Sequence, residues 1–268
     1  METQVINNTI WRRISGSLYQ KTSKTISFER INEVVDKLKI LYGILGPYSQ
    51  TRSMLSMIGQ IMLNESFNVY VPVCPDYSHV NKLYTMKSVS NGISLVAEIH
   101  INFLLKIKEI IPSLNVTFII ADHESNDLVL CNKMGISTDE FKSRINESKI
   151  ALAEFVEPLG WYSKEMSDVV PDLTSKELEY SSWISNSPQF ARQINYDTMK
   201  RDALYRKIDH NLSWEDKRKR TIHTAAQYYC LGRFVSSIGS LICNHTTTNL
   251  AWYVEAKVAV IENPVVIY

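Results

Sequence analysis

Two runs of consecutive apolar residues stand out in the middle of the chain. Residues 68–73 and 115–121 are rich in Val, Ile and Phe, and each run ends abruptly at polar residues. Short apolar runs without alternation are typical of strands that are covered on both faces. Between them, residues 92–111 carry apolar side chains at helical spacing, so the sequence predicts a strand, a helix and a second strand.

Further periodic segments extend this alternation in both directions. Apolar residues at helical spacing predict helices over 27–45, 54–62, from Ser137 to about 155, 190–209 and 216–234. Three β-rich pieces close the chain, at residues 239–244, 252–260 and 265–268. Strands that alternate with helices predict an α/β fold, with a mostly parallel sheet flanked by helices and with helical additions.

The length of 268 residues suits one large domain with an appendage. Residues 1–26 are polar and weakly patterned, which indicates an N-terminal arm. Residues 27–268 are then expected to form a single α/β domain. Within it, residues 158–190 are interrupted by prolines and a glycine, so a lid or a small insertion is expected there.

Composition and charge exclude several classes of protein. The chain has 29 Lys+Arg and 28 Asp+Glu, which argues against a generally basic nucleic-acid-binding surface. Its four cysteines are widely spaced, so neither a disulfide framework nor a thiolate metal site is expected. The first residues lack the pattern of a secretory signal, and no run approaches the ~20 apolar residues of a membrane span. We therefore expect a cytoplasmic protein without membrane contact, metal or cofactor, and no pattern indicates its oligomeric state.

Candidate chemistry lies at the ends of the two predicted strands. The first strand runs into a loop that contains Asp76 and Tyr77, with Lys82 a little further on, and the second runs into residues 122–127. Ligands of open parallel sheets bind outside the carboxyl ends of the strands, so these loops predict a binding site. Acidic residues in such positions, here Asp122 and Asp127, also cap helices or close turns, and that alternative stays open.

Other candidates are scattered along the chain. Glu98 interrupts the helix between the two strands, and His245 follows a late apolar strand. His123 and His223 are further acid–base candidates, because the unperturbed pKa of histidine lies near neutrality. The basic run at residues 217–220 can contact phosphate groups of a metabolite or RNA, but such runs are mostly solvated helix faces. Motifs of dinucleotide-binding proteins, P-loop proteins, zinc proteases and serine hydrolases are all absent from the sequence.

Several ordered motifs in residues 55–157 resemble the isocyanide synthase family, also called the pyoverdine/dityrosine biosynthesis family. The similar features are Val71-Pro-Val-Cys-Pro75, Ala97-Glu98, residues 107–112, Asp122, Asn126-Asp127 and Gly135-Ile-Ser-Thr-Asp-Glu140. His245 is similar to a histidine at the end of a late strand of the family. Two of the family's segments are not reproduced: a Lys-Ser-Pro sequence after the first strand, and Asp-Gly-Arg where this chain has Asp122-His123-Glu124.

The resemblance implies a Rossmann-like fold and a biosynthetic reaction. The family converts the α-amino nitrogen of an amino acid, usually tyrosine or tryptophan, into an isocyanide, with a pentulose phosphate as carbon donor. Asp122, Glu98 and His245 would then move protons. Substrate binding would involve the residues Asp76, Tyr77, Lys82, Asp127, Arg201, Tyr228 and Arg233, among which Lys82, Arg201 and Arg233 would hold the phosphate.

Two alternatives remain. The segments with Tyr228-Tyr229 and His245 are faintly similar to the cyclodipeptide synthases, which would imply a tRNA partner as a less favoured reading. A non-catalytic ligand-binding or interaction module that has kept the fold is the third hypothesis. The third hypothesis predicts that Asp122 and Glu98 do not share a pocket, or that their pocket is closed.

Overall fold

The computed structural model describes residues 66–73, 95–204, 211–238, 241–245 and 257–261, together with Glu33 and Asp36. All structural statements below concern these residues. The predicted arm at residues 1–26, the helix expected at 54–62 and the strand expected at 265–268 lie outside them. So do Asp76, Tyr77 and Lys82.

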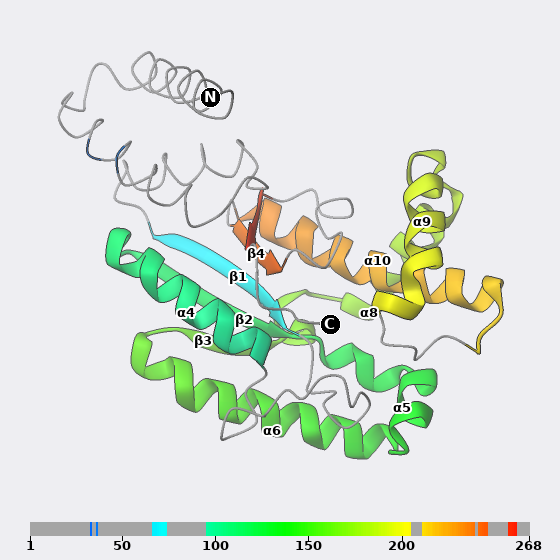
Figure 1. Ribbon diagram of the computed structural model, residues 1–268, viewed down its shortest axis with the longest axis horizontal. Coiled ribbons are helices and arrows are strands. Elements are labelled where there is room, and N and C mark those ends of the chain that lie inside the picture. Colours follow the sequence, from blue (N-terminus) through cyan, green and yellow to red (C-terminus); the bar gives the residue numbers. More distant parts are fainter. Residues whose placement is uncertain are drawn as a thin grey trace, which may run out of the picture.

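A five-stranded sheet forms the centre of the protein (Figure 1). Its strands are β1 (Phe67–Val73), β2 (Leu114–Ile120), β3 (Tyr162–Glu165), β4 (Leu241–His245) and β5 (Lys257–Ile261). They lie in the order β3-β2-β1-β4-β5, and every neighbouring pair is parallel. A mixed α/β fold with a parallel sheet, as the sequence predicts, is thereby confirmed.

The register of the two longest strands explains their apolar sequences. Phe67 pairs with Leu114 and Val73 pairs with Ile120, so the odd-numbered residues of β1 share a face of the sheet with the even-numbered residues of β2. Val69, Val71 and Val73 on β1 are all buried, and so are their partners on β2. The opposite face of β2 is also covered, because Ile119 is fully buried in a cluster of helix side chains. Burial alternates along β1 between buried and half-buried residues, whereas residues 118–120 of β2 are buried on both faces, which explains their continuous apolar run.

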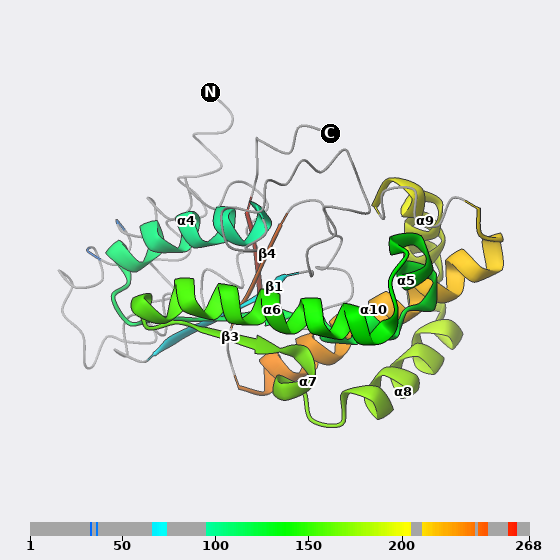
Figure 2. The same cartoon turned by 90° about the horizontal axis from the view of Figure 1, so that it is seen from below.

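Helices cover both faces of the sheet. They are α4 (Leu95–Ile110), α5 (Leu128–Met134), α6 (Thr138–Val156), α7 (Met166–Val169), α8 (Leu173–Asn186), α9 (Pro188–Leu204) and α10 (Trp214–Ser237), with short 3-10 helices η1 (Asp122–Asn126) and η2 (Glu157–Leu159). Figure 2 shows α4 and α6 on one side of the sheet, and α7, α8 and α10 on the other. Residues 158–190 contribute β3, α7 and α8 to this arrangement. None of the helices described is long and apolar enough to cross a membrane.

Local sequence signals set the ends of several helices. The hydroxyl of Ser137 accepts a hydrogen bond from the Glu140 backbone N–H and begins α6, and Ser213 does the same for α10 through Asp216. Gly135 ends α5 in the left-handed region, at φ 68°, a conformation that favours glycine.

Helix α10 joins two apolar clusters. In the first, Cys230, Leu231 and Val235 of α10 pack against Ile119 of β2 and against α7. In the second, Ile222, Ala226 and neighbouring residues of α10 pack against Ile184 of α8 and Ile194 of α9. The aromatic rings of Tyr180, Trp183, Phe190 and Tyr229 fill the space between these three helices. The fold thus fixes α10 on the sheet at one end, while its other end carries α8 and α9 beyond the sheet (Figure 1).

Candidate functional site

The carboxyl ends of the parallel strands bring several of the predicted residues to one edge of the sheet. Tyr70 pairs with Ile242, and continuing this register places His245 level with Val73. Val73 in turn pairs with Ile120, two residues before Asp122. Glu98 lies in the first turn of α4, the helix that connects β1 to β2, and therefore at the same edge. The backbone positions of Asp122, His245 and Glu98 thus share this edge of the sheet.

Asp122 begins η1 directly after β2. Its Oδ1 accepts a hydrogen bond of 3.1 Å from the backbone N–H of Ser167, in the first turn of α7. This contact joins the end of β2 to α7, so Asp122 has a structural role whatever else it does. A carboxylate accepts several hydrogen bonds, and the contact with Ser167 leaves it able to bind a ligand as well.

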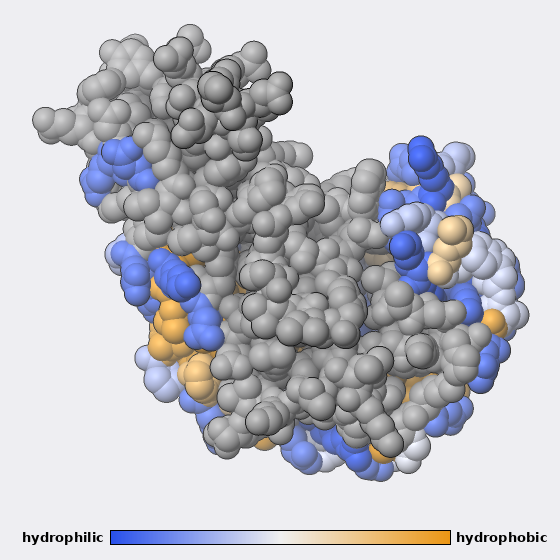
Figure 3. Space-filling model, viewed as in Figure 1, coloured by the Kyte–Doolittle hydropathy of each residue, from blue (hydrophilic) through white to orange (hydrophobic). Residues whose placement is uncertain are grey.

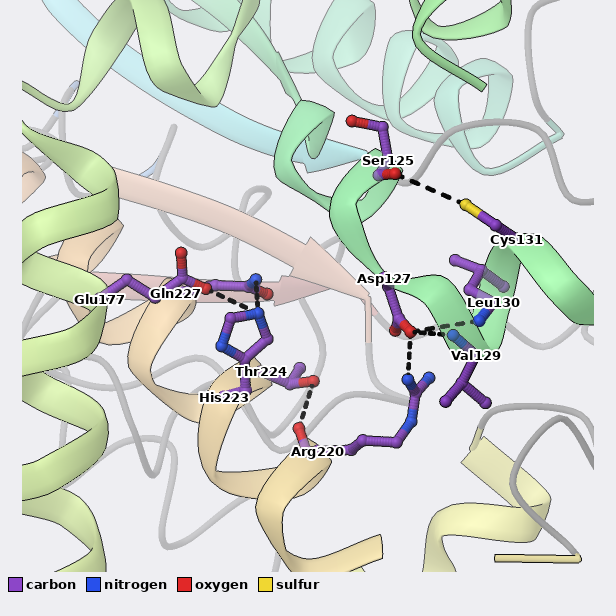
Figure 4. Close-up of polar contacts among 10 residues, drawn as sticks. All are labelled: Ser125, Asp127, Val129, Leu130, Cys131, Glu177, Arg220, His223, Thr224 and Gln227. Atoms are coloured by element: carbon purple, nitrogen blue, oxygen red, sulfur yellow. Dashed lines mark hydrogen bonds and ion pairs between the residues drawn. The ribbon is translucent and has the colours of Figure 1, made fainter. Parts of the chain in front are cut away.

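Asp127 also has a clear structural role. It is the N-cap of α5, and its Oδ1 accepts hydrogen bonds from the backbone N–H groups of Val129 at 3.0 Å and Leu130 at 3.1 Å. The same oxygen forms an ion pair with the guanidinium of Arg220 on α10 (Figure 4). The last residue of the basic run at 217–220 is therefore paired with the loop after β2.

A cluster of polar side chains lies beside this loop, between α8 and α10 (Figure 4). His223 Nε2 lies 3.0 Å from Glu177 Oε1 and 3.1 Å from Gln227 Nε2. Gln227 also hydrogen-bonds to His123 of η1. Nδ1 of His123 is buried, and within the described part of the chain it has no hydrogen-bond partner. Two imidazoles, a carboxylate and an amide thus meet next to the end of β2.

The electrostatics of this cluster favour a neutral His123 and a charged Glu177. Burial lowers the pKa of His123, and this effect outweighs the opposing effects of Glu177, Asp122 and the hydrogen bond to Gln227. Burial alone would raise the pKa of Glu177. The hydrogen bond to His223, the charges of both histidines and the hydrogen bond to Gln227 nevertheless hold the pKa of Glu177 below its ordinary value.

The other predicted binding residues lie on α9 and α10. Arg201 is 2% exposed, and its Nη1 donates a 3.4 Å hydrogen bond to Thr221 across the interface between the two helices. Tyr228 is half-buried against the apolar cluster around Ile119. Arg233 is exposed on α10, about 9 Å of helix beyond Gln227. The structure therefore groups none of these three directly with Asp122.

The outer face of α9 is mainly hydrophilic, as Figure 3 shows at the upper right. Its inner face carries Asp197, Thr198 and Arg201, all of which are buried. Gln193 donates a 2.8 Å hydrogen bond to Asp197, and Thr198 lies 3.3 Å from Thr221. These contacts indicate that Arg201 belongs to a polar interface between helices.

Sequence reasoning missed Glu177 and Gln227. A signal for Gln227 exists on α10, where Arg220, His223 and Gln227 follow at spacings of three and four and so form a polar stripe on a largely buried helix. Glu177 gives no comparable signal, because only the fold brings it to His223.

The remaining described side chains argue against a metal site and against a cysteine nucleophile. The described residues contain no group of three His, Cys, Asp or Glu that could hold a metal ion. Cys131 and Cys230 are buried and free, and burial raises the pKa of Cys230 to about 12, so neither thiol is a nucleophile near neutral pH. Imidazole and carboxylate groups at a strand edge are suited to proton transfer and to binding a charged ligand.

No protein-family model, curated protein or solved structure matches the chain. Arguments about its function therefore depend on the fold and on the groups at this edge.

Proposed function

We propose that the protein is a biosynthetic enzyme of isocyanide-synthase type. It acts on the α-amino group of an amino acid similar to tyrosine or tryptophan and takes a carbon atom from a sugar phosphate. The observation that carries the proposal is the placement of acid–base residues at the carboxyl edge of a parallel sheet, which the backbone positions of Asp122, His245 and Glu98 share.

The strand order supports a Rossmann-like reading of the sheet. The order β3-β2-β1-β4-β5 corresponds to the doubly wound order 3-2-1-4-5, in which the direction of winding reverses between the first and fourth strands. Ligands of such folds bind in the crevice at that reversal. Here the reversal lies between β1 and β4, so a ligand would meet His245 on one side and the end of β1 at Val73 on the other.

The proposed roles follow from these positions. Asp122, Glu98 and His245 would exchange protons with the amino group, since each lies at the carboxyl edge. Asp76, Tyr77 and Lys82 would bind the substrate from the loop that follows β1. The sheet register supports the roles of Asp122, Glu98 and His245 most directly.

Binding and product formation test the proposal. Tyrosine, tryptophan or ribulose 5-phosphate should raise the melting temperature, because a ligand that binds only the folded state adds about 2.7 kcal/mol of stability at a concentration ~100 times its Kd. Mass spectrometry should then detect an isocyanide product. The variants Asp122→Asn, Glu98→Gln and His245→Ala should each lose activity, whereas Asp139→Asn, at an exposed carboxylate of α6, should not. Absence of both binding and product, or full activity in all three variants, would reject the proposal.

A second candidate function is an aminoacyl-tRNA-dependent transferase similar to the cyclodipeptide synthases. It is favoured by the basic run in the first turns of α10, next to the loop after β2. Lys219 lies 4.0 Å from Asp216, which offsets part of that charge. This function predicts binding of aminoacyl-tRNA that weakens steeply with salt. A protein that binds neither tRNA nor the small molecules would fit the non-catalytic module.

A further inference from the structure

His223 presents an exposed imidazole in front of a buried carboxylate. The side chain of His223 is 53% exposed, whereas that of Glu177 is 9% exposed, and 3.0 Å separates His223 Nε2 from Glu177 Oε1. A buried carboxylate behind a solvent-facing imidazole fixes the orientation of the ring. We propose that His223 is a catalytic general base of this protein and that Glu177 is its positioning residue.

The surroundings of Nε2 accommodate either tautomer of His223. A protonated Nε2 faces the Glu177 carboxylate at 3.0 Å, and a bare Nε2 can accept a hydrogen bond from the amide of Gln227 at 3.1 Å. Both partners are buried, so solvent does not compete strongly for either contact. The negative charge of Glu177 favours the tautomer with the proton on Nε2, and this tautomer leaves Nδ1 able to accept a proton.

His123 completes the arrangement by staying neutral. Burial lowers its pKa, and a positive charge on His223 would lower the pKa of His123 further. His123 therefore adds no second positive charge to the cluster. Asp122 and Glu177 are the anionic groups that face this pair.

The proton-transfer step is defined by which nitrogen faces outward. Glu177 and Gln227 engage Nε2, and Nδ1 lies on the other side of the ring (Figure 4). Nδ1 takes a proton from the ammonium group of the substrate, and the electron pair of the broken N–H bond stays on the amine nitrogen. The amine becomes a nucleophile, and the Glu177 carboxylate, 3.0 Å from Nε2, stabilises the positive charge of the imidazolium. The identity of this substrate rests on the proposed function, but the pairing of Glu177 with His223 does not.

Acylation of histidine by diethyl pyrocarbonate tests the pairing without a substrate. The reagent attacks an unprotonated imidazole nitrogen, and mass spectrometry reads each histidine separately. The rates are compared at about pH 8, above the ordinary histidine pKa of about 6.5, so that the reaction reports the nucleophilicity of neutral imidazole. We expect His223 to react at least about ten-fold faster than His123, because buried nitrogens are shielded. Glu177→Gln should slow His223 by about three-fold or more, because the ring loses the anionic partner that increases the basicity of its free nitrogen. Glu179→Gln, which removes an exposed carboxylate from the same helix, should leave the rate unchanged. Equal rates for His223 in the wild type and in Glu177→Gln would overturn the positioning role.

Turnover tests the catalytic role. If the wild type forms an isocyanide, His223→Asn should lower kcat by about 100-fold with KM nearly unchanged, as expected for loss of a general base. Glu177→Gln should lower kcat less, and Glu177→Asp should restore part of it. Full kcat in His223→Asn would overturn the catalytic role.

If the wild type forms no product, the proposed function fails on its own, while the acylation rates still decide whether Glu177 positions His223. Circular dichroism separates either result from misfolding, and Glu177→Asp replaces Glu177→Gln if the latter does not fold.

Discussion

Asp127 shows how one side chain near the candidate site serves several structural purposes. It caps α5 through two backbone N–H groups and pairs with Arg220 on α10. Both side chains of the pair are largely shielded, since 14% of Arg220 and 24% of Asp127 is exposed. Residues beside the site are therefore expected to affect stability as much as chemistry.

Asp127→Ala should lower the free energy of unfolding by about 2 kcal/mol, because it removes an N-cap and a partly buried ion pair together. Asp127→Asn should cost about half as much, since asparagine is as good an N-cap but carries no charge. Ser137→Ala is a matched control, because it removes only the cap of α6 and should cost about 1 kcal/mol. Urea denaturation measures all three, and an Asp127→Ala loss no larger than that of Ser137→Ala would contradict a role for the ion pair.

His123 should make stability depend on pH. Its pKa is lowered in the folded state by burial, with Glu177, Asp122 and Gln227 opposing and His223 assisting. The unfolded chain therefore binds a proton more readily, so stability falls as the pH drops below the ordinary pKa of about 6.5. The slope for one such group is at most about 1.4 kcal/mol per pH unit. Urea denaturation between pH 7.5 and 5 should show this slope in the wild type and a smaller one in His123→Gln. Identical slopes would show that His123 is not responsible.

At the scale of elements, the sequence predicts best those strands whose apolar residues are buried in the core. The apolar runs at residues 68–73 and 115–121 correspond to β1 and β2 to within one residue at each end. The run at 162–165 was not predicted as a strand, because Tyr162, Lys164 and their neighbours are polar or exposed. Its pairing with β2 is what holds it in the sheet. Only tertiary contacts identify such a strand.

The sequence does not predict the cluster around His223, because tertiary contacts bring its residues together as well. Glu177 is buried on α8, but nothing in its local sequence distinguishes it from the exposed Glu179 on the same helix. Its partner His223 comes from another helix, 46 residues further along the chain (223 − 177). By contrast, Asp122 and Asp127 were predicted because they immediately follow a buried strand. Their structural contacts required the neighbouring helices.

The packing of α10 on the sheet can be tested with one pair of leucines. Leu231 is 0% exposed in the cluster with Ile119, so Leu231→Ala should cost about 2–5 kcal/mol through lost contacts and a cavity. Leu178 on α8 is 69% exposed, so Leu178→Ala should change the free energy of unfolding by less than about 0.5 kcal/mol. Equal effects in urea denaturation would mean that α10 does not pack as described.

At the scale of the whole molecule, the strand order predicts where the protein opens first. β1 is the middle strand of the sheet, and residues 118–120 of β2 beside it are buried on both faces. Backbone amides of Val71 and Phe118 should exchange with deuterium at rates set by global unfolding, whereas those of β3 should exchange faster through local opening. Hydrogen exchange read by mass spectrometry or NMR measures this order. Slower exchange in β3 than in β1 would contradict the topology.

The shortness of β3 also bears on how the protein avoids aggregation. A terminal strand offers unpaired backbone groups on which another chain can add, and long apolar edges are the most hazardous. β3 has four residues, among them Lys164 and Glu165, and Glu165 forms an ion pair with Lys149 of α6. Directly behind it lies β2, whose residues 118–121 are continuously apolar. A short, charged strand therefore shields the apolar residues 118–121 of β2 from contact with other molecules.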